Sequence, residues 1–204
     1  MINKISPYSF LRAIAAATLV LGSSAWAATP STKPNIVLMF IDDMGYGDIG
    51  PFGNTVNKTP NLDRMAEEGI KLTQFYVANT ARTPSRAALL TGTYAHRIGM
   101  DGGNGNLVVT FPGDSRGLNP SEITIAEMLW ENGYATGCFG KWHLGDQPEF
   151  MPLNQGFDTY FGIPYSNDMW PQHTARNPIT KRKYEPLPVM KQDKAVAHVA
   201  DEFD

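Results

Sequence analysis

The sequence predicts an α/β fold in which helices flank a mixed, mostly parallel central sheet, and three observations support this prediction. Residues 35–41, "NIVLMFI", form a continuous apolar run of the kind found in strands buried on both faces. Residues 62–77 and 124–139 each show a helix pattern, a glycine and then a strand pattern. Alternating helices and strands are typical of α/β domains, so we expect an α/β sheet, incomplete in this chain, rather than an all-α or all-β fold.

The first half of the chain contains the first strand, two helices and a second strand. The strand at 35–41 runs into "DDMGYGDIG", where the chain is expected to turn. Residues 62–68 are predicted to form a short helix that ends at Gly69 in the left-handed conformation, before a strand at 70–77. A second helix is predicted at 84–90, because Pro84 suits the first turn of a helix.

The second half repeats the helix and strand pattern before it becomes loop-like. Thr124 and Glu127 have the spacing of a capping box, Gly133 is expected to end that helix, and residues 134–139 are predicted to form a strand. From residue 147 onward proline, glycine and aromatic residues dominate, which indicates long loops over the mouth of a pocket. The last stretch, 191–204, has helical composition and no terminator, so we expect the chain to end within a domain.

The N-terminus predicts export from the cytoplasm. Lys4 and Arg12 precede a short apolar run, and "SSAWAA" follows with an Ala25-x-Ala27 cleavage pattern. These features indicate a signal peptide at 1–27, with a mature chain at 28–204 located in the periplasm or outside the cell. The alternative is a membrane anchor, but an apolar run of about 10 residues is too short to span a bilayer.

Composition excludes several classes of protein. The 204-residue chain has a formal net charge of −3 and no basic excess, so we expect no nucleic-acid partner. Cys138 is the single cysteine, which excludes an internal disulfide and a cysteine-based zinc site. Its neighbours "ATGCFG" suggest a small apolar core residue.

Three short stretches contain residues capable of chemistry. Asp42 and Asp43 end the first predicted strand, and their carboxylates suit Ca²⁺ or Mg²⁺. In "RTPSRAALLTG" a helix N-terminus favours anions and Arg86 lies one turn in. In "GKWHLG" a fixed cation, Lys141, and a titratable imidazole, His143, follow a strand.

Each stretch also has a structural alternative: a turn with solvated acids, a capped structural helix, and a surface loop with a Lys and a His. Together, however, they lie at strand ends or helix starts, which one sheet would bring to the same edge. A hard cation, an anion-binding helix end, a lysine and a histidine suit hydrolysis of a charged ester, phosphate or sulfate.

The stretches "IDDMGYGDIG", "TPSRAALLTG", "ENGYATGCFGKWHLG" and "YFGIPYSNDM" resemble, in order, motifs of the type I sulfatases of the alkaline phosphatase superfamily. This resemblance implies a calcium-dependent hydrolase of aryl or carbohydrate sulfate esters. It implies that Asp42 and Asp43 bind calcium. It also implies that Arg86 stabilises the formylglycine nucleophile, that Lys141 contacts sulfate and that His143 hydrogen-bonds the formylglycine hydroxyl.

The chain departs from the family pattern at its nucleophile. The family makes formylglycine from the first residue of [C/S]-x-P-x-R, and here that position is Arg82. A guanidinium has no route to an aldehyde, so a formylglycine-generating enzyme would be a partner only if position 82 were Cys or Ser. The later metal ligands of the longer family members also have no counterpart before Asp204.

Three hypotheses follow from these departures. The first is the N-terminal part of a sulfatase, with turnover by this chain in doubt. The second is a non-catalytic sulfatase-like protein that binds sulfated glycans or other anions, in which Arg82 pairs with Asp42 and Asp43 where calcium would lie. The third is a phosphatase or phosphodiesterase of the same superfamily that uses the Thr83 hydroxyl as its nucleophile.

Overall fold

The protein is represented by a computed structural model that describes residues 33–102, 107–171 and 183–200. The predicted signal peptide at 1–27 and the last four residues of the 191–204 segment lie outside the described residues. The described chain up to Lys71 belongs to one compact unit, and the chain from Leu72 onward belongs to a second. Among the described helices, none has both the length and the apolar character needed to cross a bilayer.

The first unit consists of short helices. Its elements are η1 (Tyr46–Asp48), η2 (Gly50–Phe52) and α2 (Pro60–Glu68), which confirms the helix predicted at 62–68. The Thr59 hydroxyl accepts a hydrogen bond from the Gly50 backbone N–H at 2.8 Å and contacts the Asp63 carboxylate at 3.2 Å. These contacts join the start of α2 to η2.

Two predicted strands are absent from the described chain. Residues 35–41 and 70–77 have no regular secondary structure and are largely exposed; Val37 is 79% exposed and Ile70 is 88% exposed. Strand hydrogen bonds and burial both come from neighbouring strands, and neither segment has such a neighbour among the described residues. Gly69 was also wrongly predicted to be left-handed, since its φ is −119°.

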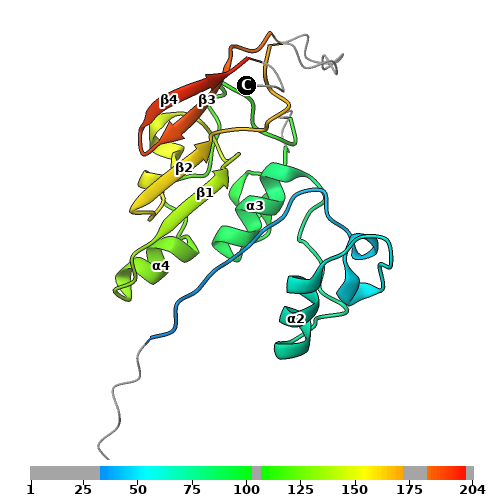
Figure 1. Ribbon diagram of the computed structural model, residues 1–204. Coiled ribbons are helices and arrows are strands. Elements are labelled where there is room, and N and C mark those ends of the chain that lie inside the picture. Colours follow the sequence, from blue (N-terminus) through cyan, green and yellow to red (C-terminus); the bar gives the residue numbers. More distant parts are fainter. Residues whose placement is uncertain (1–32, 103–106, 172–182, 201–204) are drawn as a thin grey trace, which may run out of the picture. The chain divides into compact units, whose positions relative to one another are not determined.

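The second unit contains a mixed four-stranded sheet, as the α/β prediction requires. Its strands are β1 (Gly137–Lys141), β2 (Thr159–Ile163), β3 (Leu187–Lys191) and β4 (Lys194–Val199), arranged in that order (Figure 1). β1 and β2 are parallel, whereas β2–β3 and β3–β4 are antiparallel. The prediction of a helix in the last stretch was therefore wrong over 194–199, where β4 forms a hairpin with β3.

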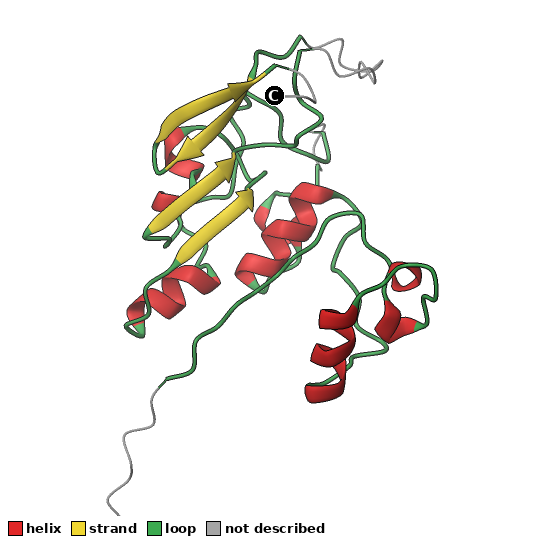
Figure 2. Ribbon diagram, in the orientation of Figure 1, coloured by secondary structure: helices red, strands yellow, loops and turns green. Residues whose placement is uncertain are grey.

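Helices accompany the sheet in the second unit (Figure 2). They are α3 (Arg82–Thr91), η3 (Ala95–Ile98), α4 (Ile125–Glu131), η4 (Pro148–Phe150) and η5 (Pro152–Asn154). The predicted capping box is confirmed, because the Thr124 hydroxyl accepts from the Glu127 N–H at 3.1 Å and the Glu127 carboxylate accepts from the Thr124 N–H at 2.7 Å. Gly133 follows α4 with a φ of +77°, as predicted.

The boundaries of the next elements differ from the predictions. β1 begins at Gly137 and runs on to Lys141, three residues later in the chain than the predicted start at 134. The expected long loops after residue 147 include η4, η5 and β2. In β2, Gly162 packs so closely on the backbone of Gly140 that a Cβ atom would collide with it. This close packing lets β1 and β2 pair in register.

The buried core includes the residues that directly follow β1. One apolar cluster includes Ala87 of α3, Trp142 and Leu144 after β1, and Tyr160 of β2, each at most 2% exposed. Cys138 packs against this cluster and is half-buried, and burial raises the pKa of its thiol to about 11. The core therefore fixes the chain immediately before and after residue 143.

Candidate active site

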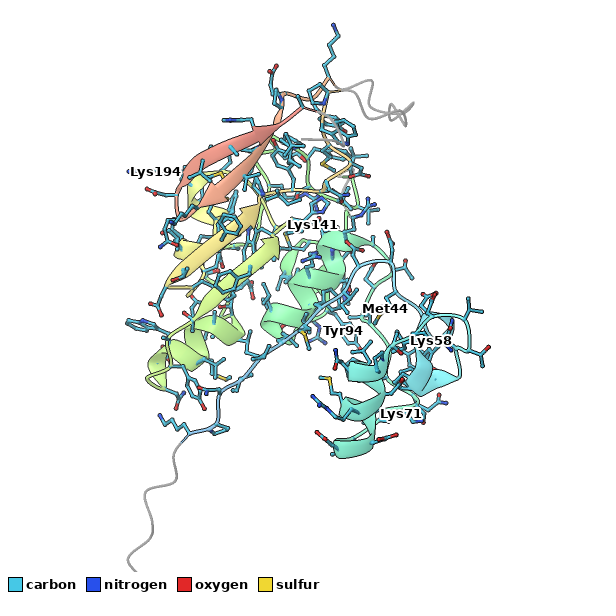
Figure 3. The ribbon with its side chains drawn as sticks, viewed as in Figure 1. Met44, Lys58, Lys71, Tyr94, Lys141 and Lys194 are labelled. Atoms are coloured by element: carbon cyan, nitrogen blue, oxygen red, sulfur yellow. The ribbon has the colours of Figure 1, made fainter. Side chains whose placement is uncertain are left out.

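The start of α3 is joined to the end of β1 by one side chain. The Arg86 guanidinium donates through Nη1 to the carbonyl oxygen of Lys141 at 2.6 Å. Figure 3 shows Lys141 at the arrowhead end of β1, beside α3. The structure thus brings together two residues that the sequence placed in separate motifs.

His143 lies at a sharp turn directly after β1. The backbone follows β2 for two further residues, since the Trp142 and His143 N–H groups donate to Ile163 and Pro164 at 2.9 Å each. His143 then adopts a φ of +63°, which is uncommon for a residue with a side chain. Such backbone strain persists where the surroundings enforce it, as the buried residues on either side do here.

The His143 imidazole is fully buried and has a hydrogen bond on one side. Its Nε2 lies 3.0 Å from the carbonyl oxygen of Thr110. Nδ1 is buried and has no hydrogen-bond partner among the described residues. The pKa of His143 is lowered to about 4, mainly by burial; the positive charges of Lys141, Arg82 and Arg86 also lower it, and the Thr110 hydrogen bond opposes the shift. The ring is therefore neutral at pH 7.

Two threonine hydroxyls hold the backbone around this ring. Thr83 Oγ1 donates to the His143 carbonyl oxygen at 2.9 Å and accepts from the Thr110 N–H at 3.1 Å. Thr110 Oγ1 lies 3.3 Å from the same His143 carbonyl. Thr83 is 0% exposed and its hydroxyl is engaged in both directions, so it is not available as the nucleophile of the phosphatase hypothesis.

Arg82 is the first residue of α3 and forms an ion pair. Its Nη1 lies 3.4 Å from Oδ2 of Asp168, and both side chains are about one-third exposed. Asp168 comes from "YSNDM", one of the motifs noted in the sequence. Arg82 therefore contributes a positive charge to the surroundings of His143 and has a carboxylate partner within the same unit.

Arg82 does not fit the formylglycine that the resemblance implies. The position that the resemblance gives to the nucleophile is occupied by a guanidinium that remains protonated and is paired with Asp168. No aldehyde hydrate can form from this side chain.

Asp42 and Asp43 belong to the first unit, whereas Arg82, Arg86, Lys141 and His143 belong to the second. Both carboxylates belong to exposed residues, and Asp43 has a φ of +54°. Within residues 33–102, 107–171 and 183–200 no three His, Cys, Asp or Glu side chains gather as metal ligands. Oxygen ligands suit calcium, but two carboxylates do not supply its usual shell of about 6–8 oxygens. The described residues alone therefore do not complete a calcium site.

Two residues of this site carried no assigned role in the sequence. Asp168 lies inside the motif "YFGIPYSNDM", and this position could have marked it as a candidate site residue. Thr110 acts through its backbone carbonyl and its place in a loop, and no sequence pattern marks such a contact. Both contacts depend on how the loops around β1 pack.

The second unit has an α/β fold in which the positive charges of Lys141, Arg82 and Arg86 act on a buried neutral imidazole after the end of β1. The sulfatase family model matches residues 34–204, nearly all of the chain after the predicted leader. The chain therefore belongs to the sulfatase family.

Relatives of known structure or function agree with this membership. The chain is 48% identical to human arylsulfatase A over 168 residues, which cover 81% of this chain and 30% of that protein. It thus spans about 30% of the length of that relative. The crystal structure of Ps i-CgsB is similar, with a TM-score of 0.68 and 34% sequence identity. The match covers 82% of this chain and 38% of the Ps i-CgsB chain.

A second crystal structure of Ps i-CgsB contains k-i-k-neocarrahexaose. It matches with a TM-score of 0.62 at 33% identity, over 78% of this chain and 36% of that chain. These likenesses support the α/β fold class of the sulfatases.

Proposed function

We propose that the chain is part of a hydrolase of aryl or carbohydrate sulfate esters. In this chain the site binds such an ester, and Arg82 prevents its hydrolysis. One observation carries this proposal: the Arg86 guanidinium donates to the Lys141 carbonyl at 2.6 Å, which brings two cationic residues together beside the buried His143 at the end of β1. A cluster of fixed cations around a neutral ring attracts an anion and leaves a proton acceptor beside it.

The proposed roles follow from the contacts. Lys141 and His143 are the proposed substrate-binding residues. Arg86 holds the Lys141 backbone through its 2.6 Å hydrogen bond and adds positive charge, which supports a role in orienting the anion site. His143, neutral at pH 7, is able to accept a hydrogen bond or a proton at Nδ1.

The loss of turnover follows from the chemistry of Arg82. Hydrolysis needs a nucleophile at the ester sulfur, and a guanidinium has no lone pair available for attack. Thr83 is the adjacent hydroxyl, and it is buried with both hydrogen-bonding directions occupied. Hydrolysis therefore requires a different residue at position 82.

The test is Arg82→Cys, produced together with a formylglycine-generating enzyme, with Arg82→Ala as the matched control. Mass spectrometry first shows whether the cysteine has been converted. We expect the converted variant to release 4-nitrophenol from 4-nitrophenyl sulfate and the alanine variant to release none. A converted variant that is folded and inactive would contradict the claim that the rest of the site suits hydrolysis.

A second candidate function is the non-catalytic binding of sulfated glycans or other anions. Arg82 favours this candidate, because its guanidinium carries a positive charge at the start of α3 and has no lone pair for nucleophilic attack. Calorimetry with a sulfated oligosaccharide and with its desulfated form is the test. Equal binding of the two forms would eliminate the candidate.

Calcium is proposed as the cofactor, with Asp42 and Asp43 as ligands, from the family resemblance and the oxygen chemistry of the two side chains. Calcium would supply positive charge where these two carboxylates bind it. Calorimetry with CaCl₂ on the chain and on Asp43→Asn tests this assignment. Unchanged affinity in the variant would remove Asp43 from the ligand set.

We further propose that the protein is exported to the periplasm or beyond, because residues 1–27 have the pattern of a signal peptide. Cell fractionation with N-terminal sequencing tests this proposal. Recovery of the chain in the cytoplasm with Met1 retained would contradict it.

A further inference from the structure

The position of the proton on His143 can be read from its surroundings. Nε2 lies 3.0 Å from the Thr110 carbonyl oxygen, and a carbonyl accepts hydrogen bonds but donates none. Nε2 must therefore carry the proton. The neutral ring then has no proton on Nδ1, which is buried without a hydrogen-bond partner among the described residues.

This arrangement depends on keeping the Thr110 carbonyl in place against the ring. Residue 110 lies in a loop, so no strand ladder fixes it. The Arg116 guanidinium holds the loop from one side, because its Nη2 donates to the carbonyl oxygens of Leu107 and Val109, the latter at 3.1 Å.

Thr83 holds the same loop from the other side and also holds His143. Its hydroxyl accepts the Thr110 N–H at 3.1 Å and donates to the His143 carbonyl at 2.9 Å. One oxygen atom thus connects the first turn of α3, the loop at Thr110 and the turn after β1. All three residues are at most 2% exposed, so water does not compete for these bonds.

We propose that Thr83 is a positioning residue: its hydroxyl locks the Thr110 carbonyl and the His143 backbone together, so that the His143 ring keeps its proton on Nε2 and presents Nδ1 as an acceptor. The low pKa of His143 agrees with this arrangement, because a second proton would leave a buried N–H without an acceptor. The use of Nδ1 toward a sulfate ester rests on the proposed function, whereas the location of the proton does not.

The experiment is nitrogen NMR of the full chain labelled on its histidines, since long-range nitrogen–proton correlations distinguish the two neutral tautomers. The spectrum of His143→Gln assigns the signal among the four histidines. We expect the wild-type His143 to be in the Nε2–H form at pH 7. A wild-type signal of the Nδ1–H form would overturn the proposal without any variant.

The variants separate the hydroxyl from the shape of the side chain. We expect Thr83→Val, which removes the hydroxyl, to mix the two tautomers and to shift the titration of His143 toward higher pH. Thr83→Ser should restore the wild-type spectrum. Thr91→Val is the matched control, because the Thr91 hydroxyl donates to the Ala87 carbonyl at the far end of the same helix. A Thr83→Val spectrum identical to wild type would contradict the proposal.

If Thr83→Val does not fold, Thr83→Cys is the second variant, because it fills similar space and has only a weak donor. We expect it to mix the two tautomers to a smaller extent. A Thr83→Cys spectrum identical to wild type would again contradict the proposal. Titration of the wild type with sodium sulfate separates this inference from the proposed function. An His143 signal that is insensitive to sulfate counts against anion binding, and the tautomer result stands independently.

Discussion

Arg82 Nη1 lies 3.4 Å from Asp168 Oδ2, so the residue at the position that the family resemblance gives to the nucleophile is paired with the loop that follows β2. Arg82 is thereby partly neutralised as an anion-binding group. The pair is about one-third exposed, and ion pairs of this kind contribute about 0.2–1 kcal/mol. The larger effect of the ion pair is that the negative charge of Asp168 offsets the positive charge of Arg82.

Asp168→Asn should strengthen anion binding. Removing the carboxylate leaves the Arg82 charge available to a sulfate group. We expect the affinity of the variant for a sulfate ester to rise by about two- to fivefold. Calorimetry with 4-nitrophenyl sulfate at low salt measures the change. Glu68→Gln is the control, because it removes a carboxylate from the exposed Arg64–Glu68 pair of the other unit. An equal rise in both variants would mean that net charge alone is responsible.

Lys141→Ala should weaken sulfate binding by about tenfold or more, since a hydrogen bond between charged groups is worth about 1.5–3 kcal/mol. The Arg86 bond to the backbone of residue 141 does not depend on the side chain and should persist. Lys191→Ala, at the end of β3, is the matched control and should bind as wild type does. If the two variants bind sulfate equally well, Lys141 is not a sulfate ligand.

The stability of the protein should fall on acidification because of His143. The unfolded imidazole binds a proton below its ordinary pKa of 6.5, whereas the folded ring stays neutral down to about 4. The unfolded state therefore holds more protons between these values, and the free energy of unfolding decreases as pH falls from 6.5 to about 4, by at most about 1.4 kcal/mol per pH unit.

Urea unfolding between pH 4 and pH 7 measures this dependence. The slope should be smaller in His143→Gln, which retains a donor for the Thr110 carbonyl and has no imidazole to titrate. His96→Gln, a histidine substitution at an exposed position, is the matched control. If His143→Gln retains the full slope, the acid sensitivity has another source.

Thr124→Ala should destabilise the second unit by about 1–2 kcal/mol, because it removes the N-cap of α4. The Thr124 hydroxyl also donates to the buried Gln155 carbonyl at 2.9 Å, so the loss extends beyond the helix. Urea unfolding at pH 7 measures the effect, and Thr124→Ser should recover most of it. A loss below about 0.5 kcal/mol would show that the cap is replaced by other groups.

The sequence predicted the helices more accurately than the strands. Local signals define helices: Pro84 in the first turn of α3 and the Thr124–Glu127 capping box of α4 both lie where expected. Strands need partners that local patterns do not specify. Residues 35–41 accordingly form no strand in the described unit, and β4 formed where helical composition was noted.

The candidate site was predictable in its motif residues and less so in its contacts. Arg86 and Lys141 were expected in one site, and a 2.6 Å hydrogen bond joins them. The engagement of Thr83 and the pairing of Arg82 with Asp168 depend on how loops pack, which sequence spacing does not determine. The assignment of Asp42 and Asp43 to calcium stays a prediction.

The most direct test of the central claim is calorimetric titration of the wild-type chain with 4-nitrophenyl sulfate at pH 7, with the absorbance of released 4-nitrophenol followed in the same sample. The claim is that the cations around His143 bind a sulfate ester and that Arg82 prevents its hydrolysis. We predict saturable one-to-one binding with no release of 4-nitrophenol. Absence of saturable heat, or release of 4-nitrophenol by the wild-type chain, would contradict the claim.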